Sequence, residues 1–106
     1  MKKYLFQLEF DNPMLDELGF DGRGDLEDAL KEFLRESEII GGVVAAGSGR
    51  GRTDLQIEID TIDVRATARR ICAFLQGLGF GAGTRFEQRL PEREAYDIPT
   101  GNAPAI

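Results

Sequence analysis

The stretch that decides the fold alternates apolar and polar side chains: Thr53-Asp54-Leu55-Gln56-Ile57-Glu58-Ile59-Asp60. Such alternation predicts a strand with one face in the core and one face in water. Residues 38–46, rich in β-branched and small side chains, predict a second strand just upstream. The glycine-rich connector 47–52 is short, so the two strands are expected to pair as a hairpin. The Gly41-Gly42 pair predicts a bulge or a close backbone approach in the first of them.

A helix is expected on each side of this hairpin. Residues 25–36 and 63–76 both repeat apolar side chains at the spacing of one helix face. Asp25 is the expected N-cap of the first helix. The expected limits of the second helix are Thr61 or Asp63 at its start and Gly77 and Gly79 at its end.

Two further strands complete the pattern, since residues 3–10 and 84–90 alternate with period two. The order strand-helix-strand-strand-helix-strand is that of the ferredoxin-like split βαβ plan. We therefore expect an α+β fold: a four-stranded antiparallel sheet in the order 4-1-3-2, with two helices on one face. Residues 1–90 are expected to form a single domain, residues 11–24 a loop within it, and residues 91–106 a tail containing Pro and Gly.

The composition is that of a globular domain without an obvious catalytic centre. The 106 residues are 42% hydrophobic and 30% charged, with no histidine and one cysteine. The lack of histidine excludes Ser-His-Asp and Cys-His catalysis and imidazole metal ligands. Cys72 lies on the apolar stripe of the second helix and is expected in the core rather than as a nucleophile. We expect no enzymatic activity, no cofactor and no metal.

The sequence also predicts the surroundings in which the protein works. The apolar residues near the N-terminus alternate with polar ones, unlike the continuous centre of a signal peptide. No apolar run approaches the length that spans a bilayer. A cytoplasmic protein without membrane contact is therefore expected.

The charge is concentrated in one part of the chain. The net charge is −6, but residues 9–38 alone hold eleven acids and three bases, a net charge of −8. Residues 61–106 hold six arginines and five acids. An acidic surface argues against binding to nucleic acid, whose phosphates need cations. The acidic segment is either a solubilising face or a surface that attracts a basic partner.

Two smaller features have more than one interpretation. The glycine run Gly47–Gly51, with Arg50 and Arg52, is either a hairpin tip or a loop that binds an anion or a protein. It is not a dinucleotide motif, because a strand follows it and not a helix. Glu9 and Glu58 would form a carboxylate pair if they lie opposite each other on adjacent strands. Neutralisation of Glu9 by Arg85 or Arg89 is the simpler alternative.

Taken together, the acidic helix 25–36, the hairpin Gly47–Gly51 and the strand Asp54–Asp60 resemble the small acidic bacterial immunity proteins of polymorphic and contact-dependent toxin systems. The resemblance covers residues 3–90. It implies an inhibitor whose acidic surface covers a basic cleft of a larger toxin domain. The candidate partner-binding residues are Asp16, Glu17, Asp21, Asp25, Glu27, Asp28, Glu32, Ser48, Arg50, Arg52, Asp54 and Glu58. The alternative is a regulatory domain that senses a small molecule or forms a homodimer.

Overall fold

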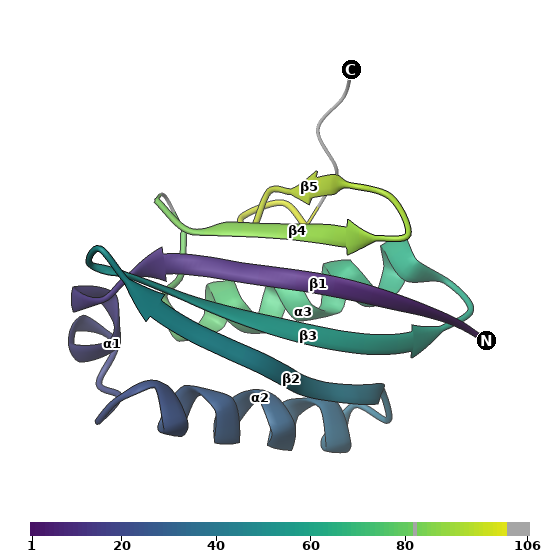
Figure 1. Ribbon diagram of the computed structural model, residues 1–106. Helices are drawn as coiled ribbons and strands as arrows, with labels where there is room; N and C mark the ends of the chain where they lie inside the picture. Colours follow the sequence, from purple (N-terminus) through teal and green to yellow (C-terminus); the bar gives the residue numbers. More distant parts are fainter. Residues whose placement is uncertain (82, 102–106) are drawn as a thin grey trace.

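One antiparallel sheet runs through the protein, with its strands in the order β2-β3-β1-β4-β5 (Figure 1). The computed structural model describes residues 1–81 and 83–101. The strands are β1 (Lys2–Asp11), β2 (Ile40–Gly49), β3 (Arg52–Thr61), β4 (Arg85–Leu90) and β5 (Glu94–Tyr96). The helices are α1 (Pro13–Glu17), α2 (Arg23–Glu36) and α3 (Val64–Leu78).

The prediction of a four-stranded sheet with two helices is wrong, because the described residues form five strands and three helices. The additional strand β5 lies in the segment expected to be a tail, and the additional helix α1 lies in the segment expected to be a loop. These two elements have three and five residues. Elements this short contain too few residues for hydrophobic periodicity to reveal them. The class of the fold is α+β, and the four longer strands are neighbours in the order β2-β3-β1-β4.

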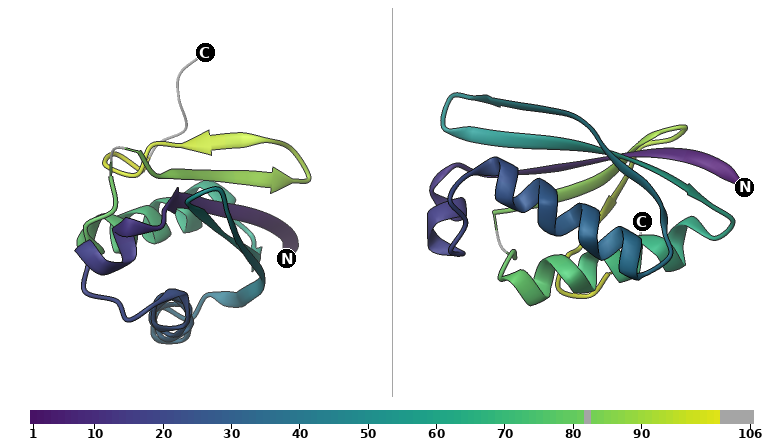
Figure 2. Two further views of the ribbon diagram at one scale, coloured as in Figure 1. Left: turned by 60° about the vertical axis from the view of Figure 1, so that its left-hand side comes forward. Right: turned by 90° about the horizontal axis from the view of Figure 1, so that it is seen from below.

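The two central strands supply the floor of the core. Ten residues of β1 pair in unbroken register with ten residues of β3, so that Phe6 lies opposite Ile57 and Leu8 opposite Leu55. All four side chains are fully buried. The longer helices α2 and α3 lie on the same side of the sheet (Figure 2) and bury their apolar stripes against these residues.

The cap at Asp63 and the end at Gly79 agree with the sequence, although α3 continues through Gly77 to Leu78. The start of α2 does not agree with the sequence. Asp63 Oδ1 accepts a hydrogen bond from Ala66 N at 3.1 Å, and Gly79 ends α3 with a φ of 109°. The N-cap of α2 is Gly22, so the prediction of Asp25 as its cap is wrong. Asp25 lies in the first turn, where its Oδ2 accepts from Asp21 N at 3.0 Å.

The segment around β5 closes the core on the β4 side. Tyr96 and Ile98 are 5% and 2% exposed. The Tyr96 ring lies 6.2 Å from the rings of both Phe6 and Phe86, which stack on each other at 5.1 Å. Burial of these aromatic rings attaches the segment to the sheet.

At the opposite side, β2 is an exposed edge strand. None of its ten residues is buried, although alternate residues of its neighbour β3 are. The close approach expected at the glycine pair occurs at Gly41, where a Cβ would lie 2.1 Å from the carbonyl oxygen of Glu58. The register shifts between Val43 and Ala45, so the bulge lies at Val44 and not at the glycines.

The glycine pair offers a matched test of the β2–β3 approach. Gly41→Ala forces a methyl group into the Glu58 carbonyl and should lower the free energy of unfolding by about 1–3 kcal/mol. Gly42→Ala meets nothing within 4 Å and should change it by less than about 0.5 kcal/mol. Urea unfolding followed by circular dichroism measures both values, and equal stabilities would contradict the close approach.

Candidate functional site

The acidic segment, residues 9–38, lies on the surface over the end of β1, α1 and α2. Most of its carboxylates are exposed to solvent. Figure 1 shows that α1, the start of α2 and the β2–β3 turn lie at the same end of the molecule. The candidate partner-binding acids of α1 and of the first turn of α2, which are Asp16, Glu17 and Asp25, therefore lie at the same end as the β2–β3 turn. Glu32 lies further along α2.

Several acids of this segment have local partners. Arg23 Nε lies 3.3 Å from Glu27 Oε2, and Arg35 forms an ion pair with Glu32. The hydrogen bond from Arg35 holds the pKa of Glu32 below its usual value. In contrast, Asp16, Glu17 and Asp28 are exposed and form no ion pair among the described residues.

Arg52 joins the hairpin to the end of β1. Its Nε donates to Glu9 Oε1 at 2.9 Å, and its Nη1 donates to Asp11 Oδ1 at 2.7 Å. A longer contact of 3.4 Å reaches the carbonyl oxygen of Gly83. Partial burial opposes the charge of Arg52, but the hydrogen bonds to the two carboxylates outweigh it and raise the pKa of the guanidinium. Arg52 is therefore neutralised within the protein.

The glycine run 47–51 completes a hairpin rather than a phosphate loop. Gly47 and Gly49 pair with β3, and the turn residues Arg50 and Gly51 both have positive φ, 53° and 79°. Positive φ at both central residues is typical of the type I′ turns of two-residue hairpins. Next to the turn, Thr53 Oγ1 donates to Asn12 Oδ1 at 2.5 Å and lies 3.2 Å from Ser48 Oγ.

A polar depression of about 350 Å³ lies beside this turn, on the face of the sheet away from the helices. We call it the hairpin hollow, and its lining residues are Gln7, Glu9, Gly49, Arg50, Arg52, Thr53 and Asp54. Arg50 has no ion pair among the described residues, but Arg52 is occupied by its two carboxylates. The hollow thus combines one available cation with the carboxylate of Asp54.

The predicted pairing of Glu9 with Glu58 is wrong. The register of β1 and β3 places Glu9 opposite Asp54 and Glu58 opposite Leu5. Glu9 is neutralised by Arg52, and not by the expected Arg85 or Arg89, while Glu58 Oε1 lies 3.3 Å from Lys3 Nζ. Within the described residues there is no group of three or more acidic or sulfur ligands that could hold a metal ion.

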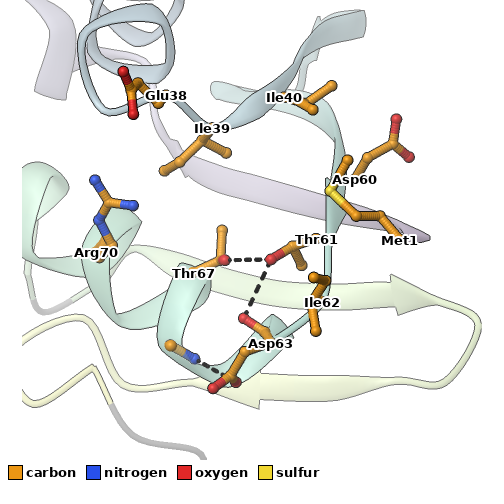
Figure 3. Close-up of a pocket in the computed structure, with 11 residues that line it drawn as sticks. Met1, Glu38, Ile39, Ile40, Asp60, Thr61, Ile62, Asp63, Thr67 and Arg70 are labelled. Atoms are coloured by element: carbon orange, nitrogen blue, oxygen red, sulfur yellow. Dashed lines mark hydrogen bonds between the residues drawn. The ribbon is translucent and has the colours of Figure 1, made fainter.

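A second depression, of about 320 Å³, lies at the opposite end of β2 (Figure 3). We call it the end hollow. Its rim carries three strongly exposed apolar residues, Met1, Ile40 and Ile62. Hydrogen-bonded threonines line its base, with Thr61 Oγ1 2.8 Å from Thr67 Oγ1. Sequence reasoning missed this site, because its residues come from four separate segments and only the isolated apolar residue Ile62 gave a local signal.

Cys72 is fully buried in α3, as the sequence predicts. Burial raises the pKa of its thiol to about 12, and the charge of Asp97 adds to the effect. Burial also raises the pKa of Tyr96 to about 12, with a further contribution from Glu94. A thiol that stays protonated at neutral pH is a poor nucleophile.

Comparison with known proteins adds nothing to this description, because no family model, no curated protein and no solved structure matches the chain. In the part of the chain that the structure describes, no helix has the length and apolar character needed to cross a bilayer.

The role of Arg52 can be tested against its neighbour in the turn. Arg52→Ala leaves Glu9 and Asp11 without their common partner and should lower the melting temperature by a few degrees. Arg50→Ala, which removes the same charge at a turn residue without an ion pair, should change it much less. A thermal melt of each variant measures the difference, and equal melting temperatures would show that Arg52 does not hold the hairpin to β1.

The buried thiol predicts a loss of stability in alkali. Below pH 8 the thiol is protonated in both states and contributes nothing to pH dependence. As pH rises above its ordinary pKa near 8.5, the unfolded chain gains from ionisation and the folded chain does not. Between pH 9 and 11 this group should reduce the free energy of unfolding by roughly 1 kcal/mol per pH unit.

The matched variant for this effect is Cys72→Ala. Loss of the thiol's packing lowers the stability of this variant by an amount that does not depend on pH. Its unfolding free energy should nevertheless fall less steeply between pH 9 and 11, because the ionisation of Tyr96 affects both proteins equally. Parallel curves for the two proteins in urea titrations at each pH would contradict the raised pKa.

Proposed function

We propose that this chain is a non-enzymatic binding protein that inhibits a larger, locally basic protein by covering it with the acidic segment. The toxin domains neutralised by bacterial immunity proteins are partners of this kind. The observation that carries the proposal is the exposure of carboxylates that the protein itself does not neutralise. Asp16, Glu17 and Asp28 are available to a basic partner without breaking any contact within the fold.

The positions of the perturbed groups support binding over catalysis. Catalytic centres concentrate groups with shifted pKa values in a cleft. Here the two strongly shifted groups, Cys72 and Tyr96, are core residues, and neither lines the hairpin hollow or the end hollow. The full sequence contains no histidine to act as a base at neutral pH. The cytoplasm is the compartment we propose, since a reduced cysteine is the normal state there.

A regulatory domain that senses a small molecule is the second candidate, and the hairpin hollow is the observation in its favour. Arg50 gives this hollow one cation for an anionic ligand. The carboxylate of Asp54 in the same hollow disfavours such a ligand, because it repels negative charge. Inhibition of a basic partner therefore ranks first.

The test is binding to the protein encoded by the adjacent gene. The two proteins should form a one-to-one complex whose association slows as salt concentration rises. Asp28→Lys should reduce the association rate by about 10-fold in low salt, measured by surface plasmon resonance. Glu92→Lys, which makes the same change of charge in the β4–β5 turn, is the control and should reduce it much less.

Two results would contradict the proposal. Equal effects of Asp28→Lys and Glu92→Lys would show that only total charge matters and that the acidic segment is not the contact. A homodimer that does not bind the product of the adjacent gene, and whose melting temperature rises with a metabolite, would favour the sensing domain.

A further inference from the structure

The two edges of the sheet differ in how they are protected. The β5 edge is three residues long, Pro91 and Pro99 flank it, and its Glu94 forms an ion pair with Arg65. Short strands, prolines and charges are the usual means of preventing a further strand from pairing. This edge is closed to strand addition.

The β2 edge lacks these three protections, and only the bulge at Val44 interrupts it among the described residues. It runs for ten residues, and the sequence from Ile39 to Gly49 contains no charged residue and no proline. Within the described residues, β2 pairs with β3 alone, so the backbone groups on its outer side face solvent. Ile40 and Val44 on this strand are 53% and 55% exposed. An edge of this kind is a template for an added strand.

A row of acids lies one strand inside this edge. Asp54, Glu58 and Asp60 of β3 are opposite Gly47, Gly42 and Ile40 of β2. Asp54 Oδ1 leans over Gly47, 3.1 Å from the point that a Cβ would occupy there. Because the glycines have no side chains, nothing on β2 at these two positions separates the carboxylates from a strand added outside it, about two strand spacings or roughly 9.6 Å away. Long cationic side chains suit this distance.

The acidic helix α2 runs alongside β2 (Figure 1), in the helix layer on the other face of the sheet (Figure 2). A strand added at the β2 edge would therefore meet carboxylates on β3 above and an acidic helix below. The end hollow adjoins the same edge, since Ile40 belongs to both. Among the described residues, the cationic side chain that lines this hollow is that of Arg70, whose Nη2 donates to the carbonyl oxygen of Ser37 at 2.9 Å.

We propose that the partner adds an extended segment along β2 as a sixth strand. The segment carries Lys or Arg at alternate positions, which pair with Asp54 and Asp60 of β3, since Glu58 already has Lys3 as its partner. It also carries an apolar residue that fills the end hollow. This inference rests on the proposed function and names the mode of binding and the chemistry of the partner. A second copy of this chain does not suit the edge, because its own β2 has no cation and it would bring another acidic helix and another acid row.

Hydrogen exchange of the complex with the product of the adjacent gene tests the inference. In an edge strand, successive N–H groups point alternately to the neighbouring strand and to solvent. On binding, the solvent-facing amides of β2 should exchange at least about 10-fold more slowly, so that protection becomes continuous within each of the two runs on either side of Val44. Binding through side chains alone would leave the alternation unchanged and would overturn the inference.

A pair of variants gives an independent readout. Asp54→Lys places a cation in the path of the basic segment and should weaken the affinity by about 10-fold. Glu92→Lys is again the control of equal charge and should change the affinity less than about 2-fold, because salt screens a charge that lies far from the contact. Equal affinities for both variants would overturn the inference. Circular dichroism of each variant checks that the fold is intact, and the exchange pattern of the unmodified protein stands independently of them.

The outcomes separate the two proposals. A complex without slower exchange in β2 overturns this inference and leaves the proposed function standing. The absence of any complex overturns the proposed function, and this inference with it. Slower exchange in β2 together with self-association, measured by light scattering, would overturn this inference. It would show that the added strand comes from a second copy of this chain and not from a basic segment of the partner.

Discussion

The pairing of β1 with β3 is the constraint on which the rest of the structure depends. Ten consecutive residue pairs without interruption place Phe6, Leu8 and Phe10 on the same face as Leu55, Ile57 and Ile59. That shared apolar face gives α2 and α3 a surface to bury, and the polar face opposite acquires its charges as a by-product of the same alternation. Arg52 reinforces the pairing at the end of the ladder, where it joins Glu9 and Asp11.

The different charge patterns on the helix side and on the open face of the sheet follow from this arrangement. The helix side and the end of β1 carry the acidic segment. The open face of the sheet carries paired charges, such as Lys3 with Glu58, together with acids that have no ion pair among the described residues, such as Asp54. Paired surface charges contribute little to stability and present no net field. Unpaired carboxylates such as Asp28 act at longer range. The availability of a charge, rather than the amount of charge, therefore separates structural acids from those open to a partner.

Local sequence signals predicted the elements well where the apolar pattern was long. The alternation around Leu55 and the cap at Asp63 specified β3 and the start of α3. Register was not predictable in this way, because a shift by an even number of residues leaves every side chain on the same face. The carboxylate pair of Glu9 and Glu58 depended on that register, and the register places Asp54 opposite Glu9 instead. Leu90 is exposed because the register of β4 shifts beside Leu5, and no residue in the sequence signals that shift. The end hollow depends on segments that only tertiary structure brings together.

The bulge at Val44 limits what the open edge can do. A single additional residue divides β2 into a shorter and a longer run, each with its own regular ladder geometry. Fibrils form when identical strands stack in register along flat, continuous edges, and an interrupted edge does not allow this stacking. Val44, which interrupts the ladder, thus protects the uncharged, glycine-rich strand β2 from fibril formation with other copies of this chain. It leaves two short stretches of β2 that can pair with a different chain.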